Sequence, residues 1–169
     1  SNLASVTLAV ASVNDDPTLA AIDDVALQEG ALLALDLPAG DADGDALQFT
    51  LELAPLGASV DDAGHLAWTA TDGDADYLFT VRVQDASGAS ATRSFTAHVA
   101  NVAPTLGLAG APVAHEGQAY TVLLASDDPG MDTVESWTID WGDGTQSVVA
   151  GDATQASHVY ENRLGATRI

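Results

Sequence analysis

The sequence contains no cysteine and no lysine, and aromatic residues make up only 5% of its 169 residues. Without cysteine, the chain forms no disulfide bond and no thiolate metal site. Four arginines stand against 25 Asp and Glu, so the formal net charge is −21. Nucleic acid and anionic membrane surfaces are therefore not expected as partners, because binding either would bring like charges together. An apolar run of about 18 residues, the length that a membrane-spanning helix needs, is also absent.

Motifs of catalytic chemistry are missing as well. The sequence has no Gly-x-Ser-x-Gly, no phosphate-binding loop and no lysine that could act as a base. Acidic pairs are frequent, but a chain with 25 carboxylates shows such pairs by chance. The histidines at 65, 98 and 158 are scattered, which is typical of strand residues rather than of a ligand set. The sequence therefore predicts a protein that is not an enzyme.

The chain repeats itself at the length of a domain. Several residues recur 87 positions later (101 − 14 and 116 − 29, for example); the pairs are Asn14 and Asn101, Pro17 and Pro104, Glu29 and Glu116, and Asp41 and Asp128. Such a unit is longer than a solenoid repeat of about 20–50 residues and suits a β-sandwich of about 100 residues. Residues 1–13, in which Val6, Leu8 and Val10 alternate with small residues, are predicted to be the last strand of a preceding repeat.

The hydrophobic pattern predicts an all-β fold. Leu47, Phe49 and Leu51 alternate with polar residues, as do Tyr77, Phe79, Val81 and Val83, which is typical of half-buried strands. Further strands are expected at 25–28, 31–37, 65–70, 91–100, 105–108, 120–125, 134–141, 146–150 and 157–160. No helical pattern longer than two turns is visible. We therefore expect two tandem β-sandwiches, at 14–101 and 102–169, the second of which lacks its last strand or two.

Residues 14–101 resemble the cadherin-like repeats of the dystroglycan type that occur in bacterial surface proteins, which are distantly related to immunoglobulin-like repeats. The resemblance is carried by short acidic elements in a matching order: Asn14-Asp15-Asp16-Pro17, Glu29-Gly30, Asp41-x-Asp43-x-Asp45 and Val83-x-Asp85. The resemblance implies a cadherin-like or immunoglobulin-like β-sandwich that binds calcium where neighbouring repeats meet.

Residues 102–169 resemble a different sandwich, the polycystic-kidney-disease (PKD) domain. Trp137 and the run Trp141-Gly142-Asp143-Gly144 match that family's Trp-x-x-Gly-Asp-Gly core, and the segment 158–160 matches its His-x-Tyr strand. In that family the motif is structural, and the Gly-Asp-Gly run forms a tight hairpin turn.

The cadherin resemblance implies two groups of calcium ligands. The upstream group comprises Asp15, Asp16, Asp41, Asp43 and Asp85, with Asp45 as a further candidate; the downstream group comprises Glu29, Asp74, Asp76, Asn101, Asp127 and Asp128. Calcium binds six to eight oxygens, and clustered carboxylates that repel one another without an ion would be drawn together by it. The downstream linker, 101–104, has lost the linker carboxylates, which weakens that group. Asp and Gly clusters are also ordinary turn chemistry, so the metal-free interpretation stays open.

These observations predict a non-catalytic extracellular module, secreted or on a cell surface. It would act as a spacer or adhesion element in a large bacterial protein, and calcium would stiffen the junctions between repeats. The alternative is a carbohydrate-binding or accessory module of a secreted polysaccharide-active enzyme, for which Trp68, Trp137 and Trp141 would be sugar platforms if exposed and core residues if buried. The expected partners are neighbouring repeats, surface glycans or proteins, and a second copy that donates its strand 1–13.

Overall fold

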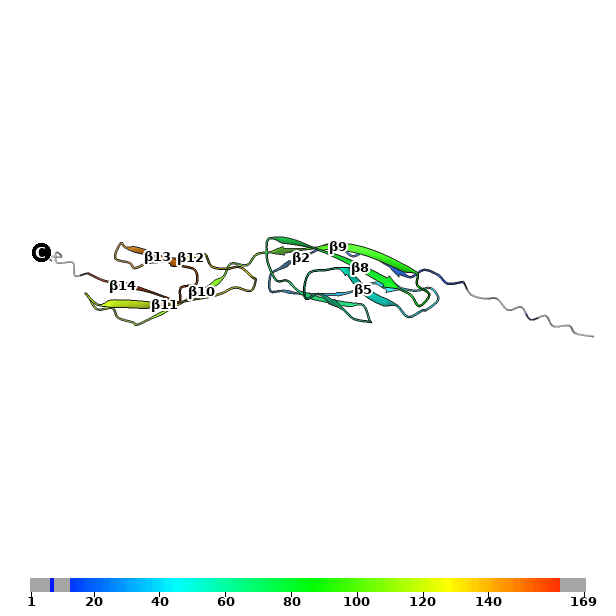
Figure 1. Cartoon of the computed structure of the whole chain (residues 1–169), viewed down its shortest axis with the longest axis horizontal. Helices are drawn as coiled ribbons and strands as arrows, with labels where there is room; N and C mark the ends of the chain where they lie inside the picture. The colour runs from blue at the N-terminus through cyan, green and yellow to red at the C-terminus, as the bar shows by residue number, and fades with distance from the viewer. Residues whose placement is uncertain (1–6, 8–12, 162–169) are drawn as a thin grey trace, which may run out of the picture. The chain divides into compact units, whose positions relative to one another are not determined.

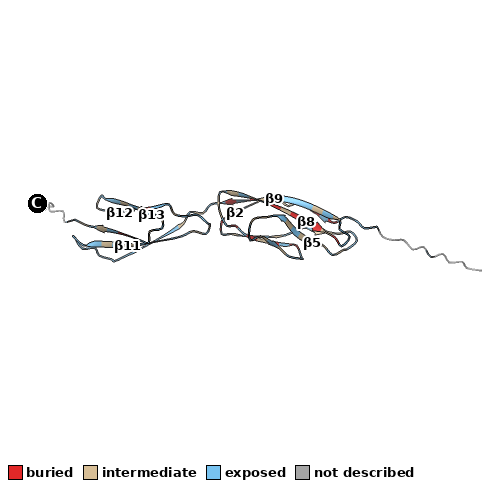
Figure 2. Cartoon of the chain, viewed as in Figure 1, coloured by how far each residue is buried: buried red, intermediate tan, exposed pale blue. Residues whose placement is uncertain are grey.

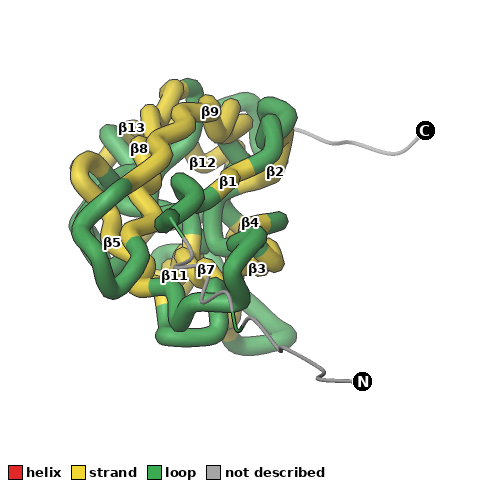
Figure 3. Tube along the Cα trace, turned by 90° about the vertical axis from the view of Figure 1, so that its right-hand side faces the viewer, coloured by secondary structure: helices red, strands yellow, loops and turns green. Residues whose placement is uncertain are grey.

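The computed structural model describes residue 7 and residues 13–161, and within that part every regular element is a β-strand (Figure 3). No helix of the described residues is therefore long and apolar enough to cross a membrane. The chain divides into two units. Unit 1 comprises Ser1–Leu27, Ala31–Ala70 and Asp74–Ala100, and unit 2 comprises Gln28–Gly30, Thr71–Gly73 and Asn101–Ile169. The predicted strand at 1–13 lies almost entirely outside the described residues.

Unit 1 is a sandwich of two β-sheets (Figure 1). The four-stranded sheet has the order β2-β9-β8-β5, with bounds Val25–Gln28, Ser90–Ala100, Ala75–Gln84 and Gln48–Leu53. The three-stranded sheet has the order β3-β7-β6, with bounds Leu32–Asp36, His65–Thr69 and Ser59–Val60. A short pair joins β1 (Thr18–Leu19) to β4 (Ala39–Gly40).

The alternation that predicted β8 also explains the core of unit 1. Phe79, Val81 and Val83 are completely buried, whereas the residues between them face outward or are half-buried (Figure 2). Phe79 stands opposite Phe95 of β9, and their rings stack with centroids 4.8 Å apart. Trp68 of β7 packs on Phe79 from the other sheet, with ring centroids 5.5 Å apart. Because both sheets contribute to one cluster, the two faces are held together by apolar burial.

Unit 2 is built from two smaller antiparallel sheets. The first has the order β10-β11-β14, with bounds Thr105–Gly110, Ala119–Asp127 and Gln155–Val159. The second is the hairpin of β12 (Ser136–Asp140) and β13 (Gln146–Ala150). The cluster of buried residues between the sheets consists of Leu124, Trp137, Trp141 and Ala156. The all-β prediction is thus confirmed, and each of the predicted strands overlaps an observed one in the described residues.

The three tryptophans belong to the cores. Trp68, Trp137 and Trp141 are 1%, 6% and 8% exposed, so the core interpretation is correct for all of them and none offers an exposed sugar platform. Each indole N–H has a partner, as buried indoles usually do. Trp68 donates to the Leu56 carbonyl, and Trp137 donates to that of Gly151.

Candidate metal centre

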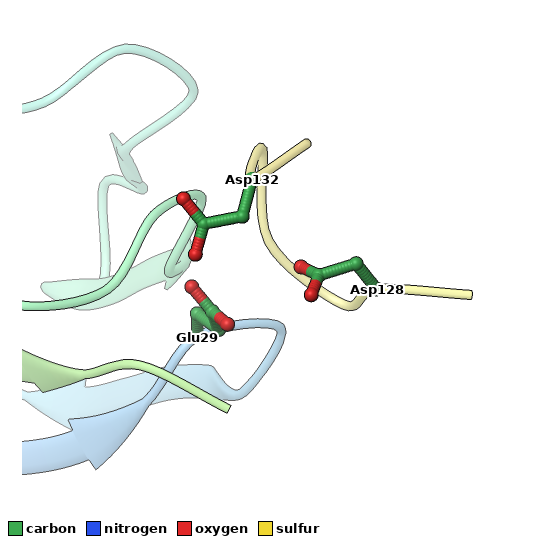
Figure 4. A group of neighbouring side chains, drawn as sticks. All are labelled: Glu29, Asp128 and Asp132. Carbon is green, nitrogen blue, oxygen red and sulfur yellow. The ribbon is translucent and has the colours of Figure 1, made fainter. Parts of the chain in front are cut away.

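Three carboxylates converge in unit 2, where Glu29, Asp128 and Asp132 offer oxygens that all lie within 4.8 Å of one another (Figure 4). It is the only group of three or more potential metal ligands within residues 13–161. Glu29 directly follows β2 and is 3% exposed, whereas Asp128 directly follows β11 and is half-buried. Asp132 lies in the loop that leads to β12 and is exposed. The group therefore joins one deeply buried carboxylate to two that approach it from a single loop.

Backbone amides orient two of these carboxylates. The amide of Val102 donates to Oε1 of Glu29 at 2.8 Å, and the amide of Gly130 donates to Oδ1 of Asp128 at 2.9 Å. Oε2 of Glu29 and Oδ2 of Asp128 are both buried without any hydrogen-bond partner in the described structure. Buried carboxylate oxygens are normally satisfied, so two orphaned oxygens in one cluster indicate a missing partner.

Two glycines allow these segments to meet. Gly30 has a φ of 75°, and a Cβ there would lie 2.8 Å from Cβ of Pro129. A Cβ at Gly130 would overlap the carboxylate of Glu29 itself. Because a larger residue at either position would push the segments apart, both glycines are needed for the convergence.

The negative charges of the cluster favour the binding of a cation. Two unit charges about 4–5 Å apart repel by roughly 3–4 kcal/mol at an effective dielectric near 20. The described residues of unit 2 include no Lys and no Arg, so no basic side chain among them opposes that repulsion. Carboxylate oxygens are the ligands that Ca²⁺ prefers, whereas Zn²⁺ favours nitrogen and sulfur donors. The donor set therefore fits a hard divalent cation.

The other acidic downstream candidates are not members of this cluster. The carboxylate of Asp76 contacts Nδ1 of His98 at 2.6 Å, and Asp74 adopts a left-handed turn conformation with a φ of 49°. Asp127 is the exposed last residue of β11. Asn101 packs by its backbone against Gly73, where an added Cβ would overlap it.

Backbone amides donate hydrogen bonds to two of the upstream candidates, Asp41 and Asp43. Oδ1 of Asp41 accepts the amides of Asp43 and Asp45 at 2.9 and 3.2 Å, and the amide of Asp15 donates to Oδ2 of Asp43 at 2.7 Å. Oδ2 of Asp41 is buried without a partner, as is the same atom of its repeat counterpart Asp128. Asp16 is exposed.

Asp85, another upstream candidate, is held by the preceding linker. Its carboxylate is 6% exposed and accepts a hydrogen bond of 2.8 Å from the side-chain amide of Asn14. This bond, followed by the backbone amides of residues 87–89, holds the pKa of Asp85 below its ordinary value. The ionised form of Asp85 thus ties the linker to the end of β8.

Sequence reasoning missed Asp132. The repeat contained the signal, because Asp132 stands 87 residues after Asp45, just as Asp128 stands 87 residues after Asp41. Applying the repeat offset to all the acidic residues of the upstream loop would have identified it.

A second polar group lies in the turn between β12 and β13. Asp143 accepts hydrogen bonds from the hydroxyl and the amide of Thr145 and lies 2.8 Å from Nε2 of His158. The Thr145 hydroxyl and then the His158 ring lower the pKa of Asp143 to about 2. The His158 ring also stacks on Trp141 with centroids 5.0 Å apart. This group joins the turn to β14 and the core and leaves no orphaned oxygen that would indicate a ligand.

The chain aligns with several known structures at low sequence identity. Five extracellular cadherin domains of protocadherin gamma B2 align with a TM-score of 0.47 at 11% identity, covering 84% of this chain and 34% of that one. The N-terminal eight Ig domains of Down Syndrome Cell Adhesion Molecule align with a TM-score of 0.43 at 16% identity, covering 88% and 28%. The SGBP-B protein of a Bacteroides ovatus mixed-linkage glucan utilization locus, solved with a heptasaccharide, aligns with a TM-score of 0.43 at 13% identity, covering 91% and 42%. The chain spans less than half the length of each.

Sequence comparison identifies the family. None of the curated proteins matches the chain. The family described as Bacterial Ig domain matches residues 14–98, which include every strand of unit 1 except the last two residues of β9. The chain therefore belongs to the Bacterial Ig domain family.

Proposed function

We propose that this chain is a non-catalytic extracellular spacer or adhesion module of a bacterial surface or secreted protein, and that Ca²⁺ stiffens the junctions between its repeats. The observation that carries the proposal is the buried, orphaned Oε2 of Glu29, a residue that offers a carboxylate oxygen within 4.8 Å of oxygens from Asp128 and Asp132. Glu29 and the Asp pair come from successive copies of the 87-residue repeat in the sequence. An ion held by all three ligands would limit the motion of one repeat against the next.

Each of the three residues would supply oxygen to the ion. Glu29 would supply the oxygen that the Val102 amide leaves unused, and Asp128 would supply the one that the Gly130 amide leaves unused. Asp132 would complete the set from the same loop as Asp128. When bound, the ion would convert the mutual repulsion of three carboxylates into attraction.

The test combines calorimetry with small-angle X-ray scattering on the full chain. We expect Ca²⁺ to bind metal-stripped protein and to bind more tightly than Mg²⁺. The spread of molecular dimensions seen by scattering should be narrower in Ca²⁺ than in chelator. Glu29→Gln and Asp128→Asn should lose both effects, whereas the control Asp62→Asn, at an exposed position, should keep both. Binding that survives in Glu29→Gln would place the ion elsewhere, and scattering indifferent to Ca²⁺ would remove the stiffening role.

We also propose that unit 2 is a sandwich of the PKD type. The turn at 141–145 supports this, because Gly142 and Gly144 have φ values of 79° and 90°, as a tight hairpin needs. The hydroxyl of Tyr160 donates to the Trp141 carbonyl, so the His-x-Tyr segment is fastened to the turn. A comparison of the unit 2 sequence with a profile of the PKD family would test the assignment.

A further inference from the structure

A hollow of about 480 Å³ lies in unit 2 beside the candidate metal centre. Its polar walls are formed by Ser126, Asp127, Asp128, Asp132, Thr133 and Asp152. Asp128 and Asp132 thus belong both to the carboxylate cluster and to the hollow. The volume falls within the range of about 300–1,000 Å³ that is typical of small-molecule sites.

The protein oxygens at the cluster do not fill the coordination sphere of Ca²⁺. Glu29 and Asp128 each have one oxygen occupied by a backbone amide, so each offers a single free oxygen. With one or two oxygens from Asp132, the three side chains supply about three or four of the six to eight oxygens that Ca²⁺ takes. The remaining positions are open to oxygens from outside, and the ion would be reached through the hollow because two of its ligands line it.

The charged residues that line the hollow favour one chemical class of ligand over others. Asp127 and Asp152 add two negative charges to those of the cluster, so an anion is repelled. A neutral polyol suits the site, because its hydroxyls donate hydrogen bonds to carboxylates and a pair of adjacent hydroxyl oxygens coordinates Ca²⁺ in place of two waters. Met131, 72% exposed at the same hollow, offers an apolar contact for the C–H face of a sugar ring.

We propose that the hollow binds the vicinal diol of a saccharide through the Ca²⁺ held by Glu29, Asp128 and Asp132. This inference rests on the calcium site proposed above and adds a ligand to it. Its recognition depends on the ion and on the acidic walls, and not on the tryptophans, all of which are buried.

The experiment measures retention of the full chain on agarose-linked mannan, galactan and β-glucan, in calcium and in EGTA. A matched column carries each polysaccharide after periodate oxidation and borohydride reduction, which destroy vicinal diols. The protein variants are Glu29→Gln, the double variant Asp127→Asn/Asp152→Asn and the control Asp62→Asn. Asp62, Asp127 and Asp152 are all exposed. Calorimetry with Ca²⁺ alone is run in parallel on each protein.

We expect retention in calcium on at least one untreated polysaccharide, and its loss in EGTA, after periodate treatment and in Glu29→Gln. The double variant should still bind Ca²⁺ but lose about tenfold in affinity for the polysaccharide, because it loses hydrogen bonds to charged acceptors. Asp62→Asn should behave as the unaltered chain does.

The outcomes separate the two proposals. If calorimetry records no Ca²⁺ binding, both fail. If Ca²⁺ binds but no untreated polysaccharide is retained, only the saccharide proposal is overturned. Retention that persists in EGTA or after periodate treatment, or that is unchanged in the double variant, also overturns it.

Discussion

The two units contain counterparts of the same repeat but bury them to very different extents. Leu19 in unit 1 is 2% exposed, whereas Leu106, 87 residues later in unit 2, is 62% exposed. Leu19 belongs to the core cluster that includes the inward residues of β8 and β9. In the described part of unit 2, no strand pair follows β14 to play that role. The same repeat position is therefore buried in unit 1 and exposed in the described part of unit 2.

The repeat also distinguishes the candidate metal centre from a second copy of its Glu-Gly motif. Glu29 and Glu116 are repeat counterparts, each followed by a glycine with positive φ. Glu29 is buried beside two aspartates, but Glu116 is exposed and belongs to no cluster of three ligands in the described residues. The Glu-Gly motif thus forms a candidate site only where an Asp pair reaches it.

The largest effect is expected in the core of unit 1. Phe79→Ala should destabilise unit 1 by about 3–5 kcal/mol, because it removes a fully buried ring between Phe95 and Trp68. Urea unfolding followed by amide hydrogen exchange reports on the two units separately. Leu78→Ala, at a neighbouring position that is 49% exposed, is the control and should cost less than about 1 kcal/mol. Equal losses in both variants would contradict the assigned core.

The repeat counterparts offer a matched pair. Leu19→Ala should cost unit 1 about 2–5 kcal/mol, whereas Leu106→Ala should cost unit 2 less than about 1 kcal/mol. The difference follows from burial alone, since the residue type and the repeat position are the same. The measurement is again urea unfolding resolved by unit. A large loss in Leu106→Ala would show that its side chain is covered in solution.

Substitution of the two glutamate counterparts should affect stability and its dependence on calcium differently. In chelator, Glu29→Gln should stabilise unit 2, because it relieves the repulsion among three carboxylates. At a Ca²⁺ concentration of about 100 times Kd, the unaltered protein gains about 2.7 kcal/mol that the variant lacks. Glu116→Gln should change neither value. Thermal unfolding in Ca²⁺ and in EDTA measures both, and a variant of Glu29 that is less stable even in EDTA would argue against the electrostatic account.

The smallest effect concerns acid stability. The folded pKa of Asp143, about 2, lies below its ordinary value of 3.8, so its stabilisation is fully present above pH 3.8 and is lost as the pH falls through about 2. Asp143→Asn should therefore make the free energy of unfolding of unit 2 depend less steeply on pH in acid, and should leave the pH dependence of unit 1 unchanged. Hydrogen exchange measured along an acid titration gives the pH dependence of each unit. An unchanged pH dependence of unit 2 in this variant would show that the Thr145 and His158 contacts do not persist in solution.

Much of the fold could be predicted from sequence, and less of the site. Period-two alternation identified strands such as β5 and β8, because it reports directly which side chains face a core. Glu29 and Asp128 were named as candidates together with Asp74 and Asp76, and only the first two belong to the cluster. Sequence order carries no information on which loops approach within ångströms of each other; here that approach depends on Gly30 and Gly130.

The most direct test is a crystal structure of the full chain grown in CaCl₂, with anomalous scattering used to locate calcium. We expect an anomalous peak about 2.3–2.6 Å from carboxylate oxygens of Glu29, Asp128 and Asp132. Three carboxylates turned away from one another, with calcium absent or bound elsewhere, would contradict it.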